Sequence, residues 1–180
     1  GGLIAYFAKD VSCVIDFLTT LHTDDSHHLL ASKLDMDRLG AFGVSLGGVI
    51  VSEASWKDRR IKASLIMESP IPKKIAQTGL PIPIMVITRP AEAMRTERKK
   101  SGGWTEKDIE QHLSTMRALF ENTVESEFVQ LPDIFHVDFT DVPLWVPFAQ
   151  QLGLSGSTPI EETHDRLNSL TLKFFEEYLQ

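Results

Sequence analysis

The sequence has few of the features that mark disulfide-rich, membrane-spanning or nucleic-acid-binding proteins. Its 180 residues include one cysteine, Cys13, so no disulfide can form within the chain. No apolar run approaches the about 20 residues of a membrane-spanning helix, and no basic-then-apolar signal sequence opens the chain. We therefore expect no transmembrane segment, and the compartment stays open with the cytoplasm slightly favoured.

Positive charge is also scarce, with 18 lysines and arginines against 25 acidic residues and a net charge of −7. A surface that binds nucleic acid needs a basic patch to neutralise phosphates. The densest basic stretch, Arg95–Lys100, is short and contains Glu97, and we interpret it as a solvated loop or helix face. No nucleic-acid partner is expected. The 42% hydrophobic content predicts one globular domain over residues 1–180.

What the sequence does contain is a G-x-S-x-G motif centred on Ser45. From glycine and serine frequencies of about 7% each, this pattern arises by chance in about one chain in twenty. Here a strand-like run precedes it and a helix-like run follows it, as a nucleophile at a strand-to-helix turn requires. Gly43 and Gly47 lack the Cβ atoms that would collide in such a turn. We predict Ser45 as a nucleophile and the Leu46 N–H as an oxyanion donor.

Hydrophobic periodicity predicts alternating strands and helices along the chain. Strands are expected at residues 38–44, 61–67, 81–88 and 127–131, and helices at 9–21, 48–56, 105–120 and 161–179, with a short turn or helix at 73–78. Such alternation is typical of an α/β fold with a parallel sheet. Cys13 falls in the first apolar helix, where we expect a small core residue.

A serine nucleophile needs a base, and the base needs an acid to orient it. His136 follows the fourth predicted strand, whereas the other five histidines lie in predicted loops or helices. Two carboxylates can serve as the acid, Glu68 at the end of the second strand and Glu92 beyond the third. The resulting order, serine then acid then histidine, is that of the α/β-hydrolases.

A cluster of three histidines and two aspartates at residues 22–28 raises the alternative of a metal site. Adjacent His27 and His28 point in different directions on any regular element, and no second ligand cluster follows at a metal-site spacing. We interpret the stretch as a solvated loop. No metal or cofactor is predicted.

The motif at residues 43–48, together with His136-Val137-Asp138-Phe139-Thr140-Asp141, resembles the α/β-hydrolases of the platelet-activating-factor acetylhydrolase-like group. Dienelactone-hydrolase-like enzymes are close relatives, and the resemblance covers residue 9 to the end. It implies a serine esterase with an α/β-hydrolase fold that acts on short acyl or lipid-type esters. In that group the acid follows the strand after the nucleophile helix, which favours Glu68 over Glu92. Asp138 is expected to order its loop by local hydrogen bonds.

Members of this group have further strands before the helix that begins near Lys9. We therefore expect the chain to be the C-terminal portion of a longer enzyme, lacking N-terminal strands that the missing half or a second chain supplies. Trp145, Phe135 and Met67 are expected to line an acyl pocket. Two alternatives stay open: a noncatalytic remnant that acts as an interaction module, and an acyltransferase or peptidase with the same residues.

Overall fold

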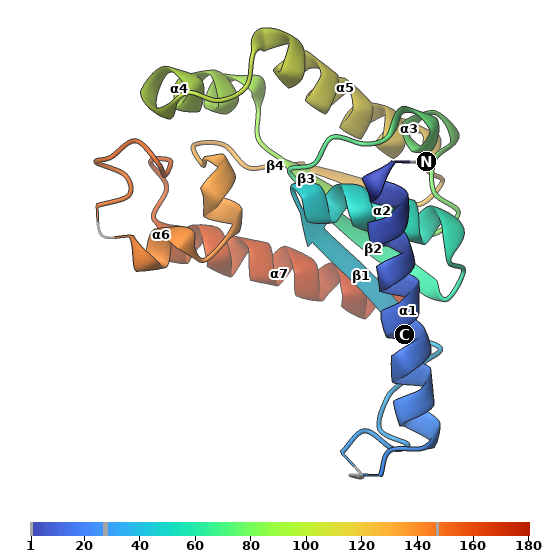
Figure 1. Ribbon diagram of the computed structural model, residues 1–180. Helices are drawn as coiled ribbons and strands as arrows, with labels where there is room; N and C mark the ends of the chain where they lie inside the picture. Colours follow the sequence, from blue (N-terminus) through green and yellow to red (C-terminus); the bar gives the residue numbers. More distant parts are fainter. Residues whose placement is uncertain (1, 27–28, 147) are drawn as a thin grey trace.

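The computed structural model describes residues 2–26, 29–146 and 148–180. Its centre is a parallel sheet in which four strands follow their chain order (Figure 1). The strands are β1 (Leu39–Val44), β2 (Ile61–Met67), β3 (Ile84–Thr88) and β4 (Ser126–Gln130). The third strand begins later than predicted because Pro81 and Pro83 have no N–H to donate to the sheet.

Helices connect the strands and cover both faces of the sheet (Figure 1). They are α1 (Leu3–Thr23), α2 (Leu46–Lys57), α3 (Lys73–Thr78), α4 (Ala91–Ser101), α5 (Glu106–Asn122), α6 (Val142–Trp145) and α7 (Ile160–Tyr178), with a 3₁₀ turn, η1, at His136–Phe139. The predicted α/β class is confirmed. The basic stretch at residues 95–100 forms part of α4. A capping box between Thr105 and Asp108 starts α5.

The core consists of two apolar layers, one on each face of the sheet. Ile66 and Val86 pack with α2, α3 and α5 on one face, while Leu65 and Met85 pack with α7 on the other. Successive residues of β2 and β3 are therefore buried on opposite faces, as in parallel sheets that helices cover on both sides. This arrangement holds the carboxyl ends of all the described strands at one edge.

Helix α1 packs against α2, and its buried residues share an apolar cluster with Ile61 of β2 (Figure 1). It buries only a narrow stripe that contains Ala8 and Ile15, whereas Phe17 is 62% exposed. The prediction that Cys13 is a core residue is wrong, because its side chain is exposed. Cys13 precedes Ile15 by two positions, which places it about 200° around the helix from the buried stripe.

The first strand forms one edge of the described sheet, and its Phe42 side chain is 62% exposed.

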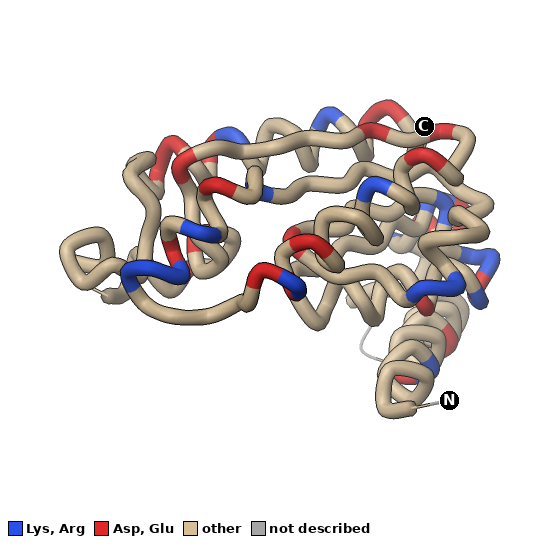
Figure 2. The backbone as a smooth tube through the Cα atoms, turned by 90° about the horizontal axis from the view of Figure 1, so that it is seen from above, with Lys and Arg blue, Asp and Glu red and all other residues tan. Residues whose placement is uncertain are grey.

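Acidic and basic positions are interspersed over the helices, as Figure 2 shows. Within the described ranges, none of the helices combines the length and the apolar character needed to cross a membrane.

Candidate functional site

Ser45 lies in a strained turn between β1 and α2. Its backbone has φ 56° and ψ −122°, a conformation that costs a non-glycine residue about 1–3 kcal/mol. The Ser45 N–H donates to the Met67 carbonyl at 3.0 Å, and the Ser45 carbonyl accepts from the Gly48 N–H at 3.0 Å. The turn is therefore fixed by the sheet on one side and by the helix on the other. Leu46, the first residue of α2, places its N–H at the positive end of that helix.

The glycines around Ser45 have unequal roles. A Cβ at Gly43 would lie 2.3 Å from the Gly47 carbonyl carbon, and a Cβ at Gly48 would lie 2.6 Å from the Ser69 Cβ. A Cβ at Gly47 would meet nothing within 4 Å. The expectation that Gly47 must be small to avoid a collision of its own Cβ is therefore wrong. Gly47 supplies the backbone against which Gly43 packs.

Glu68 directly follows β2 and has no exposure to solvent. Its backbone φ is 46°, a second strained residue at this edge of the sheet. Its Oε1 accepts from Arg89 Nε at 2.8 Å, while Oε2 accepts from Thr88 Oγ1 at 3.0 Å and from the Arg89 N–H at 3.1 Å. The carboxylate is thus a buried charge whose principal partner is a buried guanidinium.

Glu92 has a different environment. It lies in the first turn of α4, its side chain is 80% exposed, and its carboxylate is 3.5 Å from Arg95 Nη1. Exposed ion pairs of this kind contribute little to stability or to fixed geometry.

His136 begins η1 and is half-buried. Its backbone N–H donates to Glu97 Oε1 at 3.2 Å, and the other oxygen of Glu97 pairs with Arg89 Nη1. Burial lowers the pKa of His136 and nearby Arg89 reinforces this shift, whereas the charges of Glu68 and Glu97 oppose it. A neutral imidazole at pH 7 is the form that can accept a proton.

His112, on α5, is a neighbour of Glu68 that the sequence analysis did not select. It is 1% exposed, and its Nε2 lies 3.1 Å from Thr88 Oγ1 and 3.8 Å from Glu68 Oε1. Thr88 has one hydroxyl proton, which it donates to Glu68, so Thr88 accepts from Nε2–H of His112. This assignment leaves Nδ1 of His112 as an acceptor. Burial, the Arg89 charge and His136 lower the pKa of His112 to about 3.

Buried side-chain nitrogens without a hydrogen-bond partner concentrate around Glu68. The described residues contain four such atoms, and three of them belong to Arg89, His112 and His136. Because unpaired buried polar groups are rare in folded proteins and perturbed titrations gather at functional sites, this cluster is a candidate site on physical grounds alone.

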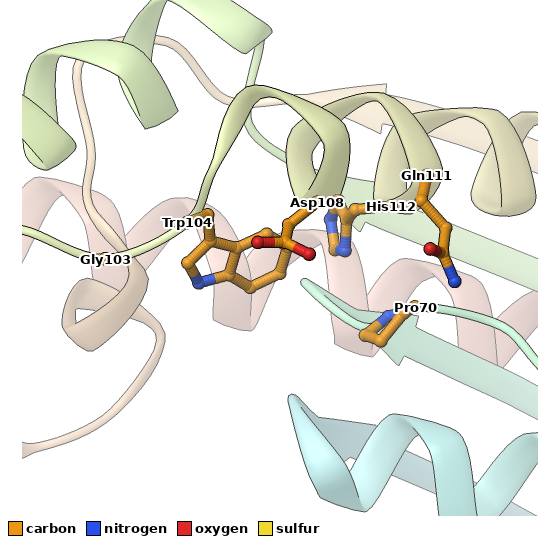
Figure 3. Close-up of a pocket in the computed structure, with 6 residues that line it drawn as sticks. All are labelled: Pro70, Gly103, Trp104, Asp108, Gln111 and His112. Carbon is orange, nitrogen blue, oxygen red and sulfur yellow. The ribbon is translucent and has the colours of Figure 1, made fainter.

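A cavity of about 450 Å³ adjoins this cluster (Figure 3). It is lined by Pro70, Gly103, Trp104, Asp108, Gln111 and His112. The Trp104 ring lies edge-on to the His112 ring at a centroid distance of 4.7 Å, and its centroid is 6.1 Å from that of His136. Neither the proline nor the tryptophan was selected from the sequence, since neither belongs to a motif.

Asp138 has a structural environment. Its carboxylate accepts from the Phe135 N–H at 2.6 Å, Ser155 Oγ at 2.6 Å and the Gly156 N–H at 2.8 Å. The bond to Phe135 is local, as expected of this residue, whereas the bonds to Ser155 and Gly156 join η1 to a distant loop.

The three residues predicted to form an acyl pocket lie in different places. Met67 lines a separate cavity of about 280 Å³ between the sheet and α7. Phe135 is 3% exposed, and the Lys100 ammonium lies 5.4 Å from its ring centroid. Trp145, on α6, is 80% exposed. Neither of these two cavities is lined by all three residues.

The interpretation of residues 22–28 as a solvated loop is wrong for part of the stretch, because His22 and Thr23 belong to α1 and Asp25 is buried. His27 and His28 lie outside the described residues. Asp25 accepts from the N–H groups of Leu29 and Leu30, both at 2.8 Å. Across the described part of the chain, no group of three or more histidine, cysteine and acidic side chains has a metal-binding arrangement.

Comparison with known proteins gives a structural match and no sequence match. No protein-family model and no curated protein sequence matches the chain. Among solved structures, the chain is similar to a ferulic acid esterase from Streptomyces cinnamoneus, with a TM-score of 0.72 and 21% identity over 99% of this chain and 49% of that chain. The match shows an α/β-hydrolase fold. The chain spans about half the length of the matched one.

The unequal glycines give a stability prediction. Gly43→Ala should lower the free energy of unfolding by about 3 kcal/mol or more, because its Cβ would overlap the backbone at Gly47. The matched control, Gly47→Ala, should be neutral or stabilising by up to about 1 kcal/mol, because alanine is the better helix former. Urea denaturation of both variants measures the difference. Equal losses in the two variants would contradict the assigned roles.

Stability should also fall in mild acid because of His112. In the unfolded chain this histidine takes up a proton below about pH 6.5, whereas its folded pKa of about 3 keeps it neutral. The unfolded state therefore binds more protons, and this group should cost the folded state about 2 kcal/mol between pH 6.5 and 5. Urea denaturation of wild type and His112→Gln at both pH values measures the slope. An identical slope in the two proteins would count against a buried neutral His112.

Proposed function

We propose that this chain carries the catalytic residues of a serine hydrolase that cleaves carboxylic esters. Ser45 is the nucleophile, His136 the base and Glu68 the acid. The main observation behind the proposal is the strained turn at Ser45. This turn lies at the same carboxyl edge of the sheet as the buried Glu68. The structural similarity to an esterase supports the same reaction class.

In the proposed mechanism, Ser45 Oγ attacks the ester carbonyl while His136 accepts the hydroxyl proton. The Leu46 N–H donates to the oxyanion that forms, and His136 returns the proton to the departing alcohol. Water then attacks the acyl-enzyme with His136 again as base, which releases the carboxylic acid and restores Ser45. The Leu46 N–H is one candidate oxyanion donor, and the loss of one such donor typically costs about 10²–10³ in rate.

Glu68 is the better supported acid. It is fully buried, and its charge raises the pKa of His136 against the effect of burial. Its oxygens accept from Arg89 and Thr88, so in the proposed mechanism Glu68 acts through its charge, which stabilises the imidazolium that forms during attack. Glu92 is exposed and pairs with Arg95 on the surface of α4, which offers no fixed orientation to a histidine.

The edge of the sheet favours a second candidate function. The exposed Phe42 of β1 and the partial coverage of the matched esterase fit a noncatalytic remnant that acts as an interaction module. An acyltransferase or a peptidase would use the same three residues. Among esters, the resemblance noted in the sequence favours short acyl or lipid-type substrates, and the name of the matched structure adds esters of ferulic acid.

The nucleophile assignment predicts covalent labelling. A fluorophosphonate probe should modify Ser45, as peptide mass mapping would show, because an activated hydroxyl attacks phosphorus as it attacks an ester. Ser45→Ala should abolish the label. An unlabelled wild-type chain with the circular dichroism of a folded α/β protein would instead favour the interaction module.

The acid assignment predicts a contrast between two glutamates. Glu68→Gln should lower kcat for p-nitrophenyl acetate by about 10²–10⁴, because a neutral amide cannot stabilise the protonated histidine. Glu92→Gln should leave kcat unchanged. Since Glu68→Gln also removes the partner of a buried arginine, circular dichroism must first show that the variant is folded. A large loss in Glu92→Gln alone would reverse the assignment.

A further inference from the structure

The proposed base, His136, is oriented by contacts other than a hydrogen bond to Glu68. Nδ1 of its imidazole is buried and has no hydrogen-bond partner among the described residues. The oxygens of Glu68 accept from other groups, namely the side chain and N–H of Arg89 and the hydroxyl of Thr88. Because a general base has to be held in one orientation to accept a proton, a different residue must fix His136.

Glu97 on α4 meets this requirement through the backbone. Its Oε1 accepts from the His136 N–H at 3.2 Å, a bond between residues 39 positions apart at the first residue of η1. Its Oε2 accepts from Arg89 Nη1 at 2.5 Å. The Glu97 side chain is only 15% exposed and that of Arg89 is fully buried, so water competes little for this ion pair.

One guanidinium therefore sets the spacing of two carboxylates with different roles. Arg89 binds Glu68 through Nε and Glu97 through Nη1, and the donor fork of an arginine is planar and rigid. Because Glu97 also holds the His136 backbone, a continuous path of contacts runs from the proposed acid to the proposed base. This path connects the ends of β2 and β3 to η1 through α4.

Charged and titratable groups face His136 from the ends of β2 and β3, from α4 and from α5. Burial lowers the pKa of His136, the charges of Glu68 and Glu97 raise it, and the charge of Arg89 lowers it. His112 on α5 is neutral near pH 7, because burial lowers its pKa to about 3. Glu97 thus acts on His136 in two ways, through the bond to its backbone and through its charge.

We infer that Glu97 is a positioning residue for His136: its carboxylate ties the start of η1 to Arg89 and thereby fixes the imidazole relative to Glu68. The inference rests on the proposed function for the role of His136 as base, whereas the contact itself requires no catalysis. Since Glu97 acts through His136 and not on the substrate, its loss should slow the chemical step more than it weakens substrate binding.

Two substitutions separate the charge of Glu97 from its reach. Glu97→Asp keeps the charge but shortens the side chain by one methylene, so that it no longer spans both donors. Glu97→Gln keeps the length, but its amide has a single acceptor oxygen, whereas Arg89 and the His136 N–H are both donors. Each variant should lower kcat for p-nitrophenyl acetate about 10–100-fold, with KM changed less than about twofold, because small displacements of a positioned catalytic group are costly.

The acid limb of the pH profile of kcat/KM should distinguish the two variants. In the wild type this limb reports the pKa of His136, which must be neutral to accept a proton. Glu97→Gln removes a negative charge that raises this pKa, so the limb should move to lower pH. Glu97→Asp keeps the charge, and its limb should stay near the wild-type position. A salt bridge that only stabilised the fold would change neither kcat of the folded protein nor the limb.

Thr123→Val provides a control that removes a buried hydrogen bond elsewhere. Thr123 Oγ1 accepts from the Leu80 N–H at 3.0 Å, and both residues precede strands, at the amino edge of the sheet. This variant should unfold at lower urea concentration than the wild type but keep its kcat. Wild-type kcat in the folded Glu97 variants would overturn the inference, and so would an equal loss of kcat in Thr123→Val.

Failure of this inference and failure of the proposed function are distinguishable. If the wild type neither hydrolyses an ester nor takes the fluorophosphonate label at Ser45, the proposed function fails. Hydrogen exchange of the His136 backbone amide, followed by NMR, then tests the contact alone. Exchange should be at least about tenfold faster in both Glu97 variants than in Thr123→Val, because they lose the bond that protects this amide. Equal exchange rates in the three variants would overturn the inference.

Discussion

A charged carboxylate without solvent exposure, that of Glu68, is the constraint on which the carboxyl edge of the sheet depends. Removing a charge from water is tolerated only where other charges and hydrogen bonds replace the solvent. Arg89 provides both its side chain and its backbone N–H, and Thr88 adds a hydroxyl. Because these donors stand at the end of β3, the ends of β2 and β3 are fixed relative to each other.

The same arginine extends this order to a distant loop. Arg89 also pairs with Glu97 of α4, and the second oxygen of Glu97 accepts from the backbone N–H of His136. A short network therefore joins two strands, a helix and the η1 turn, with Asp138 holding the other side of that turn. The position of His136 relative to Glu68 results from this network and not from contact along the chain.

Strain and unpaired nitrogens gather at the same edge. Ser45 and Glu68 both have positive φ, and Arg89, His112 and His136 each carry a buried nitrogen without a partner. Packing of the sheet between its helix layers compensates for these local costs, as is common at functional sites. The two histidines stay neutral near pH 7, one as a candidate base and the other as an acceptor beside the cavity.

The sequence by itself determined the features that depend on local spacing. These are the alternation of strands and helices, the turn at Ser45, and the placement of Glu68 at a strand end, since backbone sterics and hydrophobic periodicity act over a few residues. Only the tertiary structure gave Glu68 a buried arginine and left Glu92 in solvent, and only it brought His112 and Trp104 to the site. The contacts of Glu68 with Arg89 and of Thr88 with His112 join residues more than 20 positions apart, and no local pattern encodes which distant side chains will share a buried space.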